Sequence, residues 1–142
     1  MSAEKLYSEI FEEFEKVPGR KDKIEVLRKY DHPRFREFLW LAFAPTVEFD
    51  VSVPHYRPAV EPAGLNYTYL DQEVVKLYRF IKNHPKRVSV IPPERQKGLL
   101  IVILESLHKD EALLLVNLIK KDLGVKGLTS KLVKEAFPEI SL

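Results

Sequence analysis

Apolar residues recur at helical spacing along most of the chain and predict a series of helices. The first runs from Ser2 to Lys16, with Ser2 as its N-cap, and the second runs from Arg20 to Tyr30. Pro18-Gly19 separates the two. The sequence Asp31-His32-Pro33 ends the second helix and starts a third, capped by Asp31, that continues to about Ala44. Because the second half of this third helix is apolar on nearly all sides, we expect it at the centre of the fold.

The segment from Thr46 to Tyr67 has a different pattern. Its first apolar residues alternate with polar ones, which favours an extended stretch and one edge strand. Prolines then interrupt the segment, and a loop of this length is more than packing alone usually requires. Helical spacing lies on both sides, so we interpret the segment as a loop that wraps the core. The alternating residues are Val47, Phe49, Val51 and Val53, and the prolines are Pro54, Pro58 and Pro62.

Helical spacing resumes at Tyr69 and stops near His84-Pro85. Pro92-Pro93-Glu94 is a strong helix start, so we interpret the apolar run from Leu99 to Leu107 as helix rather than as a buried strand. Two further helices are predicted, one from Lys109 to Leu123 and a short one from Ser130 to Phe137 that is N-capped by Thr129.

The predicted fold is therefore all-α. Residues 1–142 form a single compact domain of about six to seven helices with one long proline-containing extended loop. The aromatic side chains of the helices are expected in the core rather than as platforms for nucleic-acid bases. They are Phe35, Phe38, Trp40, Phe43, Tyr78 and Phe80.

Composition removes several kinds of chemistry. The chain has no cysteine, which excludes disulfides, thiolate zinc sites and a cysteine nucleophile. Its four histidines are scattered, with no pair at i, i+4, and no glycine-rich phosphate loop or nucleophile elbow occurs. We therefore expect no metal, no cofactor and no enzyme activity. No apolar run approaches the roughly 18–20 residues of a membrane helix, so we expect no membrane partner.

Charge is distributed unevenly, although the formal net charge is only +2. The first 16 residues carry a local charge of −3, whereas the stretch from Lys76 to Lys97 carries +6. Such asymmetry is typical of a polyanion-binding face, and it is also found on ordinary solvated helices. The pattern alone leaves both interpretations open.

The most informative motif lies between Leu118 and Pro138. A basic helix ends in Asp122-Leu123, a turn contains Gly127, and Thr129 starts a short helix that finishes at Phe137-Pro138. This order resembles the end of the N-terminal DNA-binding domain of tailed-phage ATP-dependent DNA ligases. The N-terminal third is similar as well, with a basic second helix and a third helix that enters an extended aromatic segment. The turn here is slightly longer than in the ligases, and the Lys-x-Asp-Gly adenylation motif is missing.

The resemblance implies a non-catalytic protein that binds duplex DNA through its phosphates, without sequence specificity. Gly127 would let the backbone approach a phosphate, and Thr129 would begin a helix whose amides attract one. Plain turn and N-cap roles for these two residues remain the alternative. The expected DNA contacts are Lys120, Lys121, Lys126, Gly127, Thr129 and Lys131, with a second basic surface at Lys82, Lys86, Arg87, Arg95 and Lys97.

The chain also looks like small tailed-phage proteins of similar length, some of which are described as inhibitors of the prohead maturation protease. The alternative function is accordingly a protein-interaction module that binds a phage or host protein. Its recognition loop would be Thr46 to Tyr67, presenting Val51, Val53, His55 and Tyr56. Either resemblance places the protein in the host cytoplasm or in the virion.

Overall fold

The structure is a computed structural model that describes residues 6–57, 69–82, 84, 92–140 and 142. These residues form seven α-helices and one 3₁₀ helix, with no β-strand among them. The predicted all-α fold is confirmed. The elements are α1 (Tyr7–Lys16), α2 (Arg20–Lys29), α3 (Pro33–Phe43), α4 (Leu70–Glu73), the 3₁₀ helix η1 (Val74–Phe80), α5 (Pro93–Ser106), α6 (Lys109–Ile119) and α7 (Ser130–Ala136).

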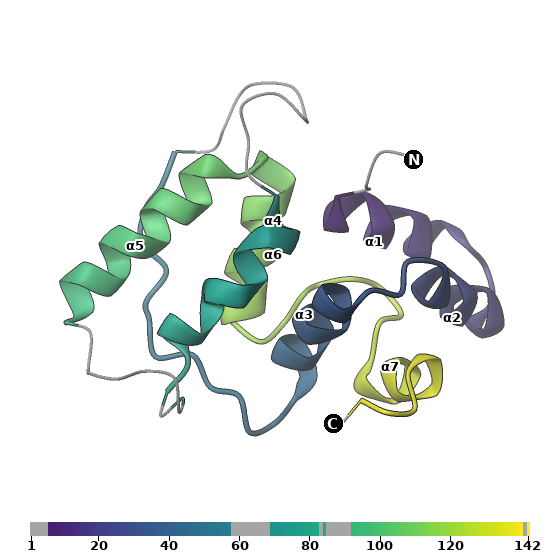
Figure 1. Cartoon of the computed structure of the whole chain (residues 1–142). Helices are drawn as coiled ribbons and strands as arrows, with labels where there is room; N and C mark the ends of the chain where they lie inside the picture. Colours follow the sequence, from purple (N-terminus) through teal and green to yellow (C-terminus); the bar gives the residue numbers. More distant parts are fainter. Residues whose placement is uncertain (1–5, 58–68, 83, 85–91, 141) are drawn as a thin grey trace.

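Helix α6 is the hub of the arrangement, since it packs against α1, α3, α4 and α5. Helix α3 contacts both α6 and η1, in keeping with the central position expected for it. Figure 1 shows α5 at the left edge of the molecule and α2 and α7 at the right, where α7 packs against α2. Helix α5, with Arg95 and Lys97, and helix α7, with Lys131, therefore lie on different sides.

The core is built from the apolar faces of these helices. Phe14, Phe35, Phe38, Phe80 and Phe137 are fully buried, and the Tyr7 ring meets Phe35 edge-on at 5.3 Å between centroids. The other aromatics of the helices, Trp40, Phe43 and Tyr78, are half-buried and pack against this cluster. The expectation that the aromatics serve the core is confirmed.

The start of α1 differs from the prediction. The helix begins at Tyr7, because Leu6 is extended and the first amides find an acceptor elsewhere. The predicted N-cap, Ser2, lies outside the described residues. The buried Glu111 carboxylate of α6 accepts from the amides of Tyr7 (3.0 Å) and Ser8 (2.6 Å). Glu111 thus satisfies two of the orphan donors at this helix start. Burial raises the pKa of Glu111, outweighing the opposite effect of these hydrogen bonds.

Three other predicted boundaries are corrected. His32, and not Asp31, is the N-cap of α3, because the Asp31 carboxylate is held by Arg36 at 2.6 and 2.8 Å while His32 Nδ1 accepts from the Arg34 amide. Helix α6 ends at Ile119 rather than Leu123. Two residues after this end, Lys121 adopts a left-handed conformation with φ of 61°. The helical segment after Tyr69 ends at Phe80, short of His84.

Among the described residues, the extended segment forms a single antiparallel bridge, Phe49 to Ile81, instead of an edge strand. The Asp50 amide donates to Phe80 O and the Lys82 amide donates to Glu48 O. The pairing stays short because η1 occupies the partner segment through Phe80. The part of the predicted loop from residue 58 to its end at Tyr67 lies outside the described residues. Within the described part of the chain, no helix is long and apolar enough to cross a membrane.

Candidate nucleic-acid interface

The basic side chains near the predicted interface fall into two groups, and the first group caps helices. Lys121 Nζ donates to Leu41 O at 2.8 Å and to Ala44 O at 2.9 Å. These carbonyls end α3 and have no partner inside the helix. Burial lowers the pKa of Lys121. The Lys121 ammonium is therefore directed at the end of α3 and not at solvent.

Lys23 performs the same task for α1 and explains the glycine of the turn. Its Nζ donates to Phe14 O at 2.9 Å and lies 4.8 Å from the centre of the Phe14 ring. Gly127 has φ of +85°, and a Cβ there would lie 3.3 Å from Cε of Lys23. The φ of Gly127 thus favours glycine, and a Cβ there would also make a tight contact with the Lys23 side chain. Lys23 occupies the side of Gly127 on which a Cβ would lie. The expected approach of a phosphate to the Gly127 backbone stays a prediction.

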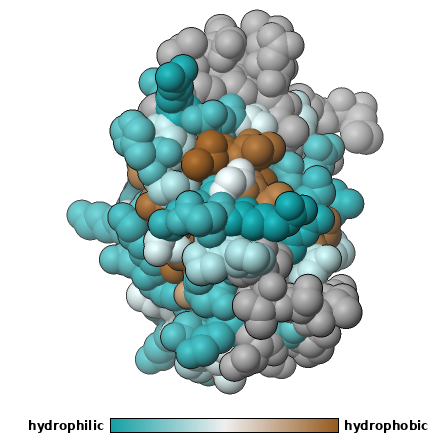
Figure 2. Space-filling model, turned by 90° about the vertical axis from the view of Figure 1, so that its left-hand side faces the viewer, coloured by the Kyte–Doolittle hydropathy of each residue, from teal (hydrophilic) through white to brown (hydrophobic). Residues whose placement is uncertain are grey.

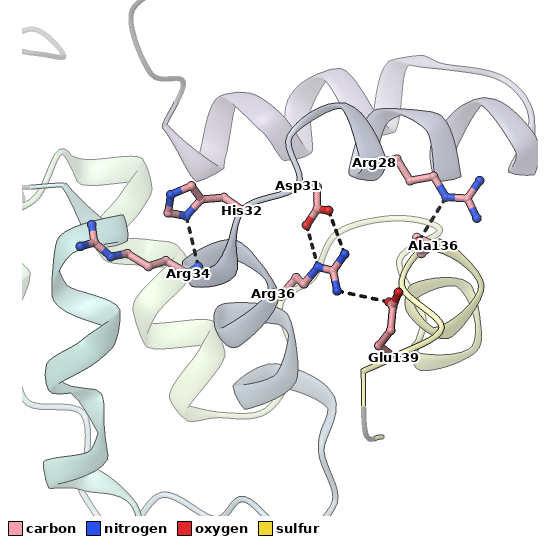
Figure 3. Close-up of polar contacts among 7 residues, drawn as sticks. All are labelled: Arg28, Asp31, His32, Arg34, Arg36, Ala136 and Glu139. Carbon is pink, nitrogen blue, oxygen red and sulfur yellow. Dashed lines mark hydrogen bonds and ion pairs between the residues drawn. The ribbon is translucent and has the colours of Figure 1, made fainter.

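Arg28 caps the third helix of this group (Figure 3). Its guanidinium donates to Ala136 O at 3.1 Å and to Glu135 O at 3.0 Å, at the end of α7. Helices α1, α3 and α7 therefore each place a basic side chain from a different helix or turn against their terminal carbonyls. A cation at that end is favoured by the helix dipole as well as by the hydrogen bonds. These roles were not apparent from the sequence, because each joins residues distant in the chain.

Arg36 ties the same region together. Figure 3 shows it between Asp31 and Glu139, and its guanidinium stacks 4.8 Å from the centre of the Phe137 ring. The hydrogen bond from Arg36 lowers the pKa of Asp31. On the adjacent α7, hydrogen bonding from Arg20 lowers the pKa of Glu135. The carboxylates of this side are thus engaged with arginines.

Thr129 is the N-cap of α7, as predicted. Its Oγ1 accepts from the Leu132 amide at 3.2 Å, and its carbonyl accepts from the Val133 amide. The hydroxyl is used inside the chain, and α7 has only seven residues. The cap accounts for Thr129 without any ligand.

The second group of basic residues is directed at solvent. Lys120, Lys126 and Lys131 are exposed, and none forms a salt bridge within the part of the chain that the structure describes. They sit at the end of α6, in the turn and in the first turn of α7. The Lys126 amide donates to Glu15 Oε2 at 2.8 Å, which fastens the turn to α1 while the ammonium stays outside.

Three residues of the second predicted surface lie in the described part of the chain. Lys82 and Arg95 are exposed, and Lys97 is half-exposed with a long ion pair to Glu94 at 3.9 Å. Lys86 and Arg87 lie outside the described residues. Helix α5, which carries Arg95 and Lys97, lies across the molecule from α7 in Figure 1. Arg95 and Lys97 are therefore separated from Lys131, which lies on α7.

Most of the residues proposed to form a protein-recognition loop pack against the core of the protein itself. Val51, Val53 and Tyr56 pack against the core, and only His55 is exposed. The Arg57 amide is held by Glu105 Oε2 at 2.8 Å. Among residues 6–57, 69–82, 84, 92–140 and 142, no cluster of His, Asp or Glu could hold a metal ion.

Comparison with known proteins gives a family but no activity. No curated protein sequence matches the chain. A family model described as a family of unknown function, DUF6433, matches residues 10–125, a range that contains α2 through α6. Because the match covers well over half of the sequence, the chain belongs to the DUF6433 family.

Proposed function

We propose that this protein is a non-catalytic DNA-binding protein that contacts the phosphates of a duplex without reading its sequence. The observation that carries the proposal is the group of three exposed lysines, Lys120, Lys126 and Lys131, that lack a salt bridge in the described residues. Lysine side chains of this kind supply affinity for phosphates and carry no information about base sequence.

The surroundings favour an anion on this side. Three carboxylates of this side have partners: Glu135 pairs with Arg20 at 2.9 Å, Glu139 pairs with Arg36 at 3.2 Å, and Glu15 accepts from the Lys126 amide. The carboxylates that remain unpaired around Lys120, Lys126 and Lys131 are therefore fewer than the acidic residues counted in the sequence. The resemblance to the phage ligase domain supports the same side of the molecule.

The proposed contact is made by side chains and not by the helix start. Gly127 packs on Lys23, and the Thr129 hydroxyl caps its own helix. These two residues shape the turn that carries Lys126. Removing lysines should then weaken binding far more than altering the cap.

The test compares two double variants that each remove two positive charges. Lys126→Ala with Lys131→Ala alters the proposed surface, whereas Lys82→Ala with Lys97→Ala alters the other basic set. Binding to a fluorescein-labelled duplex is measured by fluorescence polarisation at several salt concentrations. Each lost phosphate contact lowers the log–log salt slope by about 0.9, so the first variant should lose about 1.8 in slope and about tenfold in affinity.

The second variant should keep the wild-type slope, because its lysines do not contact the duplex in this arrangement. Equal losses in both variants would show that total charge matters and that the proposed surface is wrong. An unchanged slope in the first variant would remove Lys126 and Lys131 from the DNA contact.

A further inference from the structure

The outward side of α5 carries a feature that neither the core nor DNA binding explains. Arg95, Gly98, Val102 and Glu105 recur at spacings of three, four and three residues and are all exposed. Val102 is 68% exposed. Figure 2, which looks at the side of the molecule where α5 lies, shows an apolar patch bordered by hydrophilic residues.

Within the part of the chain that the structure describes, this outer stripe is not needed for packing. Helix α5 has an unbroken apolar run from Leu99 to Leu104, more than one buried face can hold. Leu100, Ile103 and Leu104 face the core, and α6 is the helix on which α5 packs. Val102 is left outside, with the half-exposed Leu99 and Ile101 on either side.

Gly98 is the second unexplained feature of the stripe. A Cβ at this position would meet nothing within 4 Å. No contact inside the described chain therefore requires glycine there, although an interior helical glycine has the poorest propensity apart from proline. On an exposed face, a missing side chain leaves a depression into which another molecule can place its own.

The stripe is complementary to itself when turned end for end. Gly98 and Val102 lie two residues on either side of Leu100, and Arg95 and Glu105 lie five residues on either side. In an antiparallel pair of α5 helices, Val102 of each copy would face Gly98 of the other, and Arg95 would face Glu105. A parallel pair would instead place each charge against its own kind. This exchange of contacts is the property of a two-fold symmetric interface.

We propose that the protein forms a symmetric homodimer through antiparallel packing of α5. Val102 of each copy fills the space over Gly98 of the other, with Leu99 and Ile101 closing the apolar centre. Arg95 forms an ion pair with Glu105 of the second copy at each end. The Arg57 amide occupies Oε2 of Glu105, which leaves Oε1 for this pair.

The dimer is expected to be weak. One helix from each copy buries less than the roughly 1,200 Å² of a standard stable interface. We expect a dissociation constant of about 10 µM or weaker, with rapid exchange. Sedimentation velocity of the full chain between about 5 and about 500 µM spans this range.

Charge reversal tests the orientation. Arg95→Glu and Glu105→Arg each convert two attractive pairs into two repulsive ones and should weaken the dimer by about tenfold. The double variant should return to within about twofold of the wild type, because the opposite charges face each other again. The two residues lie about 15 Å apart along one helix, so the restoration cannot arise within one chain. Lys21→Glu, on α2 at the other side of the molecule, is the charge-matched control and should leave association unchanged.

Two apolar variants test the centre of the interface. Val102→Asp should abolish association, and Gly98→Ala should weaken it while the monomer remains folded by circular dichroism. A wild-type protein that stays monomeric across the whole concentration range would overturn the proposal. A double charge variant that associates no better than the single ones would overturn the antiparallel arrangement.

Discussion

The cap that Glu111 places on α1 can be tested by removing its carboxylate. Glu111→Leu fills much of the same volume and leaves the amides of Tyr7 and Ser8 without an acceptor. Glu111 is 1% exposed, and the Tyr7 contact is buried. Each buried donor left unpaired costs about 1–3 kcal/mol, with the lower end for the part-buried Ser8 amide. We expect a total loss of about 3 kcal/mol in the free energy of unfolding.

The assay is urea unfolding at neutral pH, followed by circular dichroism and supported by thermal melts. A loss of this size lowers Tm by about 10 °C in a chain of this length. Glu111→Gln keeps one acceptor and removes the cost of burying a charge, so it should destabilise less than Glu111→Leu. Glu25→Leu, at an exposed position of α2, is the control and should change stability by less than about 0.5 kcal/mol. A loss below about 1 kcal/mol for Glu111→Leu would refute the capping argument.

Three further predictions concern the other contacts. Gly127→Ala should destabilise by about 1–2 kcal/mol in urea unfolding, because its φ of +85° suits glycine and the new Cβ meets Lys23; a neutral result would contradict this. Lys121→Met should lower the free energy of unfolding by about 1–3 kcal/mol, because it removes two hydrogen bonds to carbonyls at the end of α3. The same variant should leave the salt slope of DNA binding unchanged. A reduced slope would show that Lys121 contacts DNA. The pKa of Asp31 is lower in the folded state than in the unfolded state, so the stabilisation by its carboxylate is present above pH 3.8 and is lost as the pH falls through the folded-state pKa. Asp31→Asn should therefore lose less stability than the wild type between about pH 4 and about pH 2. Parallel curves of stability against pH for the two proteins would contradict this.

Local sequence signals predicted the helices well. Pro93 marks the start of α5, and Thr129 caps α7 through its hydroxyl as the sequence indicates. These signals succeed because they act within one turn of helix. The start of α1 could not be placed in the same way, since its acceptor comes from α6.

One feature of the sequence does indicate the cap that Glu111 forms on α1. Glu111 lies four residues before Leu115 on α6 and next to Ala112, both fully buried, so an acid occupies the buried face of α6. A carboxylate on such a face must find buried donors, although the sequence does not say which. The roles of Lys23, Arg28 and Lys121 were hidden for a related reason. A lysine that caps a distant helix and a lysine that faces solvent have the same local sequence pattern.

The difference between a capping lysine and a solvent-facing lysine decides which side chains can contact DNA. Counting lysines in the sequence treats Lys121 and Lys126 alike, whereas the structure directs the first at α3 carbonyls and the second at solvent. Only the second kind is available for a phosphate. The proposed DNA contacts are therefore the three side chains Lys120, Lys126 and Lys131, and not the whole basic segment.

The most direct test of DNA binding is the affinity of the wild-type protein for nicked and intact duplexes of two unrelated sequences. Fluorescence polarisation at salt concentrations up to about 150 mM gives both affinity and slope. We predict submicromolar binding at low salt, a steep linear log–log salt dependence, and equal affinities for the two sequences. No binding at low salt, or a clear preference for one sequence, would contradict backbone contact through these lysines as the function of the protein.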